Sequence, residues 1–132
     1  ALYQRSVRAI AGNPDGSCVF HHPALDEAGR WFGRCMEGLA EGSGYGLVMD
    51  DQGRVLEYVG SAQSGLAEGV GAMVFRSPAE TGAVYFEGSF RKGLPDGVVK
   101  VEEPGRRSRV RLFHAGRDSG AASADELQRI QF

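Results

Sequence analysis

The sequence predicts an all-β fold, a single-layer twisted antiparallel β-meander of stacked hairpins with a short C-terminal helix. Two observations predict it. An aromatic residue followed by spaced glycines returns every twenty-seven or twenty-eight residues, beginning at Trp31, Tyr58 and Phe86, with a weaker fourth copy at Phe113. The segments between the glycines alternate and are rich in Val, Leu and Tyr. Such a period is typical of stacked copies of one small unit, and the alternation is typical of strands.

Each unit is predicted to be a strand, a tight turn and a second strand. The successive strand–turn–strand ranges are 30–36, 37–42 and 43–50, then 54–63, 64–69 and 70–76, then 83–91, 92–97 and 98–103, with 108–114 beginning a fourth unit. We expect a single repeat domain over 1–132, divided into an N-terminal cap and half hairpin (1–29), repeats at 30–57, 58–84 and 85–112, a partial repeat (113–122) and a helix (123–132).

The two ends differ from the middle. A strand over 4–10, a turn at 13–16 and a short strand over 17–21 form the predicted half hairpin. At the other end, Ser123 and Glu126 have the spacing of a capping box. That pattern predicts a helix over 124–131, which would cover the edge of the last strand.

The glycines are expected to have two structural tasks. Those at both ends of each turn allow a positive φ without steric cost. Those inside strands, such as Gly60, are expected to let an aromatic side chain of a neighbouring unit approach the backbone closely. The glycines assigned to these tasks are Gly33, Gly38, Gly42, Gly44, Gly60, Gly65, Gly69, Gly71, Gly88, Gly93 and Gly97.

Composition narrows the classes of function. The chain has 132 residues, 20 glycines without a three-residue period, and a net charge of −2. Collagen is therefore excluded, and no overall charge attracts nucleic acid or an anionic membrane. No apolar run approaches the roughly 20 residues of a membrane span. Because the chain opens at Ala1, we expect that a signal peptide has been removed.

The spaced glycines resemble the MORN repeat. The best copy is Tyr85-Phe86-Glu87-Gly88-Ser89-Phe90-Arg91-Lys92-Gly93-Leu94-Pro95-Asp96-Gly97, which departs from the pattern where Val99 replaces the last glycine. The resemblance covers about 18–120 and implies a binding or scaffolding module; some members of the family have been proposed to contact lipid. The segments 16–20 and 31–38 are also similar to the opening of bacterial envelope proteins with MORN repeats, in which two cysteines flank the start of the array. This resemblance implies a periplasmic or extracellular protein.

Cys18 and Cys35 are the only cysteines. On the predicted strands they are neighbours across an antiparallel pair, and this placement permits a disulfide that would stabilise the fold by about 3 kcal/mol. A disulfide would imply an oxidising compartment. Two separate buried thiols in a cytosolic protein are one alternative. A zinc site with His21 and His22 is another, although consecutive residues of a strand point to opposite faces. We expect no metal and no cofactor.

The sequence favours a non-enzymatic module that binds a protein partner. It contains no nucleophile elbow, Walker loop or H-E-x-x-H motif. The repeated aromatics Trp31, Tyr58, Phe86 and Phe113 serve either as core or as a partner-binding stripe, since aromatic residues are enriched in binding hot spots. The open edges of such a sheet also allow homo-oligomers.

Two alternatives remain. Arg107, Arg109 and Arg111 would share one strand face and could grip anionic lipid headgroups, unless they simply pair with the preceding strand, where Glu102 and Glu103 lie. A hydrolase would instead use carboxylates on the concave face, which otherwise are solvated turn residues; the candidates are Glu37, Glu41, Glu68 and Asp96.

Overall fold

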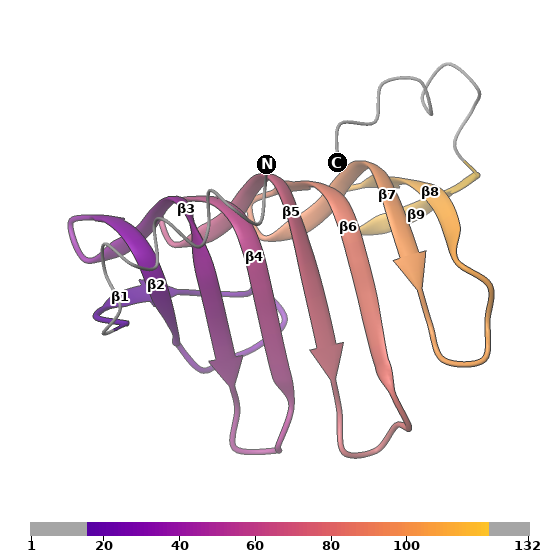
Figure 1. Cartoon of the computed structure of the whole chain (residues 1–132), viewed down its shortest axis with the longest axis horizontal. Coiled ribbons are helices and arrows are strands. Elements are labelled where there is room, and N and C mark those ends of the chain that lie inside the picture. Colours follow the sequence, from indigo (N-terminus) through magenta and orange to yellow (C-terminus); the bar gives the residue numbers. More distant parts are fainter. Residues whose placement is uncertain (1–15, 122–132) are drawn as a thin grey trace.

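The structure, a computed structural model, describes residues 16–121, which form nine strands and no helix. The strands are β1 (Cys18–Phe20), β2 (Gly29–Met36), β3 (Leu39–Met49), β4 (Val55–Gln63), β5 (Leu66–Arg76), β6 (Ala83–Arg91), β7 (Leu94–Glu102), β8 (Arg109–His114) and β9 (Arg117–Ala121). They form one sheet in chain order, each antiparallel to the next (Figure 1), so the predicted meander is confirmed. The predicted strand over 4–10 and the C-terminal helix lie outside the described residues.

The hairpin turns are shorter than predicted. Each has two residues, both with positive φ, and we call these turns tips 1 to 4: Glu37–Gly38, Ser64–Gly65, Lys92–Gly93 and Ala115–Gly116. Two such residues match the right-handed twist of the flanking strands. The expectation that Gly42, Gly69 and Gly97 close the turns is therefore wrong. These glycines lie inside β3, β5 and β7, opposite register shifts in the preceding strands.

A row of five paired glycines crosses the sheet from β2 to β6. It consists of Gly33, Gly44, Gly60, Gly71 and Gly88, each in register with the next. In the first two hairpins, the aromatic side chain two residues before the first glycine lies over the glycine pair. A Cβ placed on Gly44 would lie 2.5 Å from Trp31 Cζ2, and one on Gly71 would overlap the ring of Tyr58. The close approach was predicted, but its assignment to a neighbouring unit is wrong.

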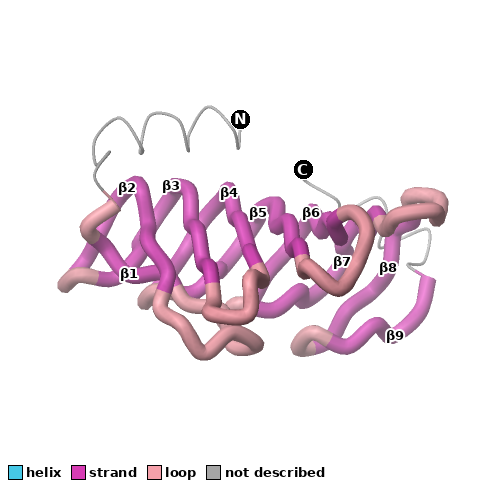
Figure 2. The backbone as a smooth tube through the Cα atoms, turned by 90° about the horizontal axis from the view of Figure 1, so that it is seen from below, coloured by secondary structure: helices cyan, strands magenta, loops and turns pink. Residues whose placement is uncertain are grey.

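The sheet is coiled into a trough, whose two sides are visible from below in Figure 2. β1 closes one end of it. On one edge β1 pairs with the start of β2, where Cys18 is opposite Trp31; on the other edge Val19 is in parallel register with Leu39, at the start of β3. Leu39 pairs with Met36, the last residue of β2. β2 must therefore curve around β1, because β1 lies beside the start of β2 on one edge and beside Leu39 on the other.

The core fills the inside of this trough. Phe20, Trp31 and Tyr58 are completely buried, and Phe20 stacks on the other two rings with centroid distances of 5.4 and 5.5 Å. Phe90 meets Tyr58 edge-on at 5.5 Å. A smaller cluster at the far end contains Val99, Val101 and Phe113, with partly buried Phe86 and Val84 packed against it.

The fourth unit has a different register from the predicted one. The row that contains Trp31, Tyr58 and Phe86 continues through Val101 to Arg109, and the glycine row continues through Val99 to Arg111. Phe113 is instead in register with Gly97, as Phe90 is with Gly69, so it holds the position of Phe90 and not that of Phe86. Because β7 is shorter than β5, β8 begins earlier in the repeat than the spacing predicted. Arg109 and Arg111 therefore occupy the aromatic row and the glycine row.

We expect Gly71→Ala to lower the free energy of unfolding by about 3 kcal/mol, because the new methyl group and the Tyr58 ring would compete for one space. Gly38→Ala is the control. At Gly38, in tip 1, φ is 80° but no atom lies within 4 Å of the new Cβ, so only the backbone cost of about 1 kcal/mol remains. Urea unfolding followed by the fluorescence of Trp31 measures both. Equal losses of unfolding free energy would show that contact with the Tyr58 ring is not the reason why Gly71 must lack a side chain.

Candidate functional site

The repeated aromatics belong to the core. Trp31 and Tyr58 have no exposed surface, Phe113 is 6% exposed and Phe86 is partly buried. Their polar atoms are used inside the hairpins: Trp31 Nε1–H donates to the Arg34 carbonyl at 2.8 Å, and the Tyr58 hydroxyl donates to the Ser61 carbonyl at 2.5 Å. Of the two roles that the sequence left open for this ladder, the structure gives Trp31 and Tyr58 the packing role.

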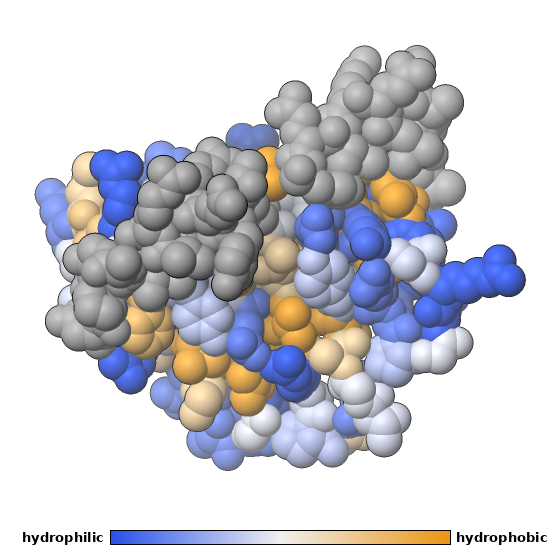
Figure 3. All heavy atoms as spheres, in the orientation of Figure 1, coloured by the Kyte–Doolittle hydropathy of each residue, from blue (hydrophilic) through white to orange (hydrophobic). Residues whose placement is uncertain are grey.

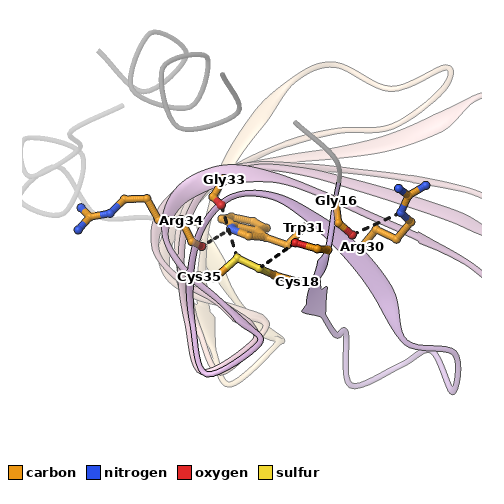
Figure 4. The surroundings of a disulfide bond; sticks show 8 residues. Gly16, Cys18, Arg30, Trp31, Gly33, Arg34 and Cys35 are labelled. Atoms are coloured by element: carbon orange, nitrogen blue, oxygen red, sulfur yellow. Dashed lines mark hydrogen bonds between the residues drawn. A yellow bond between two sulfur atoms is a disulfide. The ribbon is translucent and has the colours of Figure 1, made fainter. Parts of the chain in front are cut away.

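Cys18 and Cys35 form a disulfide, with Cα atoms 6.1 Å apart (Figure 4). Cys18 is buried on β1, whereas Cys35 lies at the exposed end of β2 beyond Trp31. The bond ties β1, and with it Phe20, to the first hairpin. The pairing predicted from the sequence is confirmed, and neither cysteine is available as a metal ligand.

The three arginines do not form one stripe. Arg107 is exposed in the loop before β8. Arg109 and Arg111 lie on the inward rows at the end of the trough, where they bind carboxylates at 2.5 Å (Glu103) and 3.0 Å (Asp118). The guanidinium of Arg111 and the backbone N–H of Gly120 lower the pKa of Asp118 below its usual range. These ion pairs end the apolar ladder with a polar cap, as terminal units of repeat proteins commonly do.

The turn carboxylates hold successive hairpins together. Glu41 accepts the backbone N–H of Ser64 at 3.0 Å, Glu68 that of Lys92 at 3.1 Å, and Asp96 that of Ala115 at 2.9 Å. Each carboxylate therefore binds the first residue of the next tip. The second residue is also bound, since the N–H groups of the tip glycines donate to Ala40, Ala67 and Pro95. The sequence placed three of these acids at one repeat position; it did not show that they bind the following unit.

We expect Glu68→Ala to lower the free energy of unfolding by about 1 kcal/mol, because the N–H of Lys92 loses its acceptor. Glu68→Gln keeps an acceptor oxygen and should recover most of the loss. Glu80→Ala, in an exposed loop, is the control and should change stability little. Amide hydrogen exchange should quicken at Lys92 only in the alanine variant. If Glu68→Ala and Glu80→Ala behave alike, the carboxylate does not fasten the tip.

His22 lies in the loop after β1, where its Nδ1 accepts the backbone N–H of Ala24 at 3.0 Å. Burial lowers the pKa of His22 from 6.5 to about 4. No group of three metal-binding side chains occurs between residues 16 and 121.

Because the folded state holds His22 neutral, its contribution to stability is complete above pH 6.5 and is lost as the pH falls towards 4. We expect the free energy of unfolding to decrease over this interval. His22→Asn keeps an acceptor near Nδ1 but does not titrate, so it should remove this part of the decrease. A proton NMR titration that gives His22 its ordinary pKa would contradict the expectation.

The outer face of the sheet carries an apolar patch, on which Gly16 lies against the ring of Phe32. Alternate residues of β2 to β5 point away from the core, and their register places them side by side. We define the outer patch as Phe32, Tyr45, Leu47, Met49, Val55, Val59, Ala72 and Val74. Its members are half-buried except Met49, which is 60% exposed. Figure 3 shows apolar residues gathered among charged ones on the face towards the reader.

A polar cluster lies within the outer patch, since Glu57 is in register with Leu47 on one side and with Val74 on the other. Glu57 accepts the Tyr45 hydroxyl at 2.8 Å and also binds Arg76, which lowers the pKa of the Glu57 carboxyl. Burial and the Glu57 hydrogen bond raise the pKa of Tyr45 to about 12. Tyr85 and Glu87 form a second hydroxyl–carboxylate pair. The strand alternation in the sequence contains the signal for this face, which the glycine pattern and the aromatic ladder do not carry.

The edges of the sheet are unequal. Both edges of β1 are paired, whereas β9 has a neighbour on one side only among residues 16–121. Self-association through sheet edges stays a prediction, with β9 as its one candidate strand there.

Comparison with protein-family models, with curated proteins and with solved structures found no match. Within the described part of the chain there is no helix that is long and apolar enough to cross a membrane.

Proposed function

We propose that this chain is a non-enzymatic, MORN-like protein-binding module that works in an oxidising compartment, such as a bacterial envelope. The observation that carries the proposal is the outer patch. The inner face of the sheet is filled by the chain's own side chains, whereas exposed apolar patches on soluble proteins commonly mark interaction surfaces. The outer patch is therefore the surface where a partner protein would bury apolar area.

The composition of the outer patch supports this role. Phe32 and Tyr45 are neighbouring aromatic residues, with ring centroids 5.9 Å apart, and the guanidinium of Arg30 lies over the Phe32 ring. Aromatic residues and arginine are enriched in binding hot spots. The Cys18–Cys35 bond supports the compartment, because disulfides persist where the surroundings are oxidising.

The test is site-specific photocrosslinking in cells that produce the protein, with the crosslinker at Val59. Val59 lies in the outer patch on β4 and faces away from the core. We expect one discrete protein adduct, and we expect Phe32→Lys to abolish it while the protein stays folded, since Phe32 points away from the core.

The matched control places the crosslinker at Glu80, in the exposed loop before β6. Equal adducts from Val59 and Glu80, or an adduct from Val59 that survives Phe32→Lys, would remove the outer patch as a binding surface.

A further inference from the structure

The chain already contains one extended segment bound across the hairpin tips. We call residues 18–25 the strap. The N–H of Val19 donates to the Gly38 carbonyl of tip 1 at 2.9 Å, and the N–H of His21 donates to the Gly65 carbonyl of tip 2 at 2.7 Å. Phe20, between them, points into the core and is fully buried. Two residues of extended chain thus carry the strap from one tip to the next, with one side chain inserted for each step.

The strap stops at tip 3. Its third contact is made by Pro23, whose Cδ would lie 2.6 Å from a Cβ on Gly93. Proline has no N–H, so it cannot give the Gly93 carbonyl the bond that tips 1 and 2 receive. The strap then turns away, since the N–H of Leu25 donates to the His22 carbonyl at 3.1 Å.

Tips 3 and 4 repeat the geometry of the occupied tips. The N–H groups of Gly93 and Gly116 donate to the preceding hairpin at 2.9 and 2.8 Å, as that of Gly65 does at 3.0 Å. The same leucine position flanks each tip glycine: a Cβ on Gly65 would lie 3.4 Å from Leu39, and one on Gly116 would lie 3.3 Å from Leu94. Strap atoms lie near Gly65 and Gly93, whereas no strap atom is among the nearest neighbours of Gly116.

The charge of the tips changes along the array. Residues at and beside tips 3 and 4 include four exposed basic side chains, and none of them forms an ion pair within 16–121: Arg91, Lys92, His114 and Arg117. Tips 1 and 2 have Glu37, Gln63 and Ser64 at comparable places. The neighbouring acid Asp96 is already engaged by the N–H of Ala115.

We propose that tip 4 binds an extended acidic segment of a partner protein, which continues along the ridge beyond Pro23 of the strap. A backbone N–H of the segment would donate to the carbonyl of Gly116, because Pro23 already lies on Gly93. Acidic side chains of the segment would meet Arg91, Lys92 and Arg117. The continuity with the strap supplies the geometry, and the unpaired cations supply the charge preference. This surface is separate from the outer patch, so the inference goes beyond the proposed function.

The test uses a fluorescent peptide, Glu-Glu-Val-Phe-Val-Glu, and measures anisotropy with the disulfide-bonded protein. We expect saturable binding that weakens as salt is added. The double substitution Arg91→Glu and Lys92→Glu should weaken it by at least about tenfold. Arg34→Glu, at an exposed basic residue near tip 1, and Val59→Lys, in the outer patch, are matched controls and should leave binding unchanged.

A second peptide carries N-methyl groups on the two valines that flank the phenylalanine. It keeps every charge but loses two N–H donors, so we expect it to bind at least about tenfold more weakly. Amide NMR shifts in the labelled protein should map to tips 3 and 4. Equal binding of the two peptides, an equal effect of Arg34→Glu, shifts confined to the outer patch, or no binding at low salt would each overturn the proposal.

Discussion

The contact between an aromatic ring and a pair of glycines is the interaction on which the rest of this structure depends. Trp31 lies on Gly44, and Tyr58 on Gly71, at distances that leave no room for a Cβ. Without side chains along this row, each ring can lie flat on the backbone and the sheet can coil over it. The trough, the stacking of Phe20 and the burial of the core all follow from that space.

A coiled one-layer sheet must still be finished at both ends. At the first end β1 brings Phe20 into the stack and is tied down by the disulfide at Cys35. At the other end Arg109 and Arg111 occupy the aromatic and glycine rows and bind carboxylates instead of apolar neighbours. The two solutions differ in chemistry, but both replace the missing next unit. In the middle of the array, Glu41, Glu68 and Asp96 each bind the tip of the next hairpin. Each unit therefore stabilises its neighbour, as in other repeat proteins.

Much of the fold could be predicted because it repeats. The period, the alternation and the tip glycines predict the hairpins and their order. The placement of Cys18 and Cys35 on neighbouring predicted strands predicts their pairing. The errors arose where one sequence pattern fits two registers. Phe113 satisfied the aromatic position by spacing alone, yet a shorter β7 moved Arg109 into that row. Likewise Gly69 fitted a turn end and a strand bulge equally well, and the two-residue tip decided between them.

The sequence by itself determined the repeating β-hairpin and the residues that each copy must keep small, because those requirements are local and recur. Only the tertiary structure decided which face became the core. Alternation assigns residues to two faces but does not say which face closes, and that depends on coiling around the glycine row. It also decided that Glu68 binds the next tip and that Arg111 is ion-paired, because each needs a partner from another hairpin or strand. The outer patch is what remained once the aromatic ladder had been enclosed.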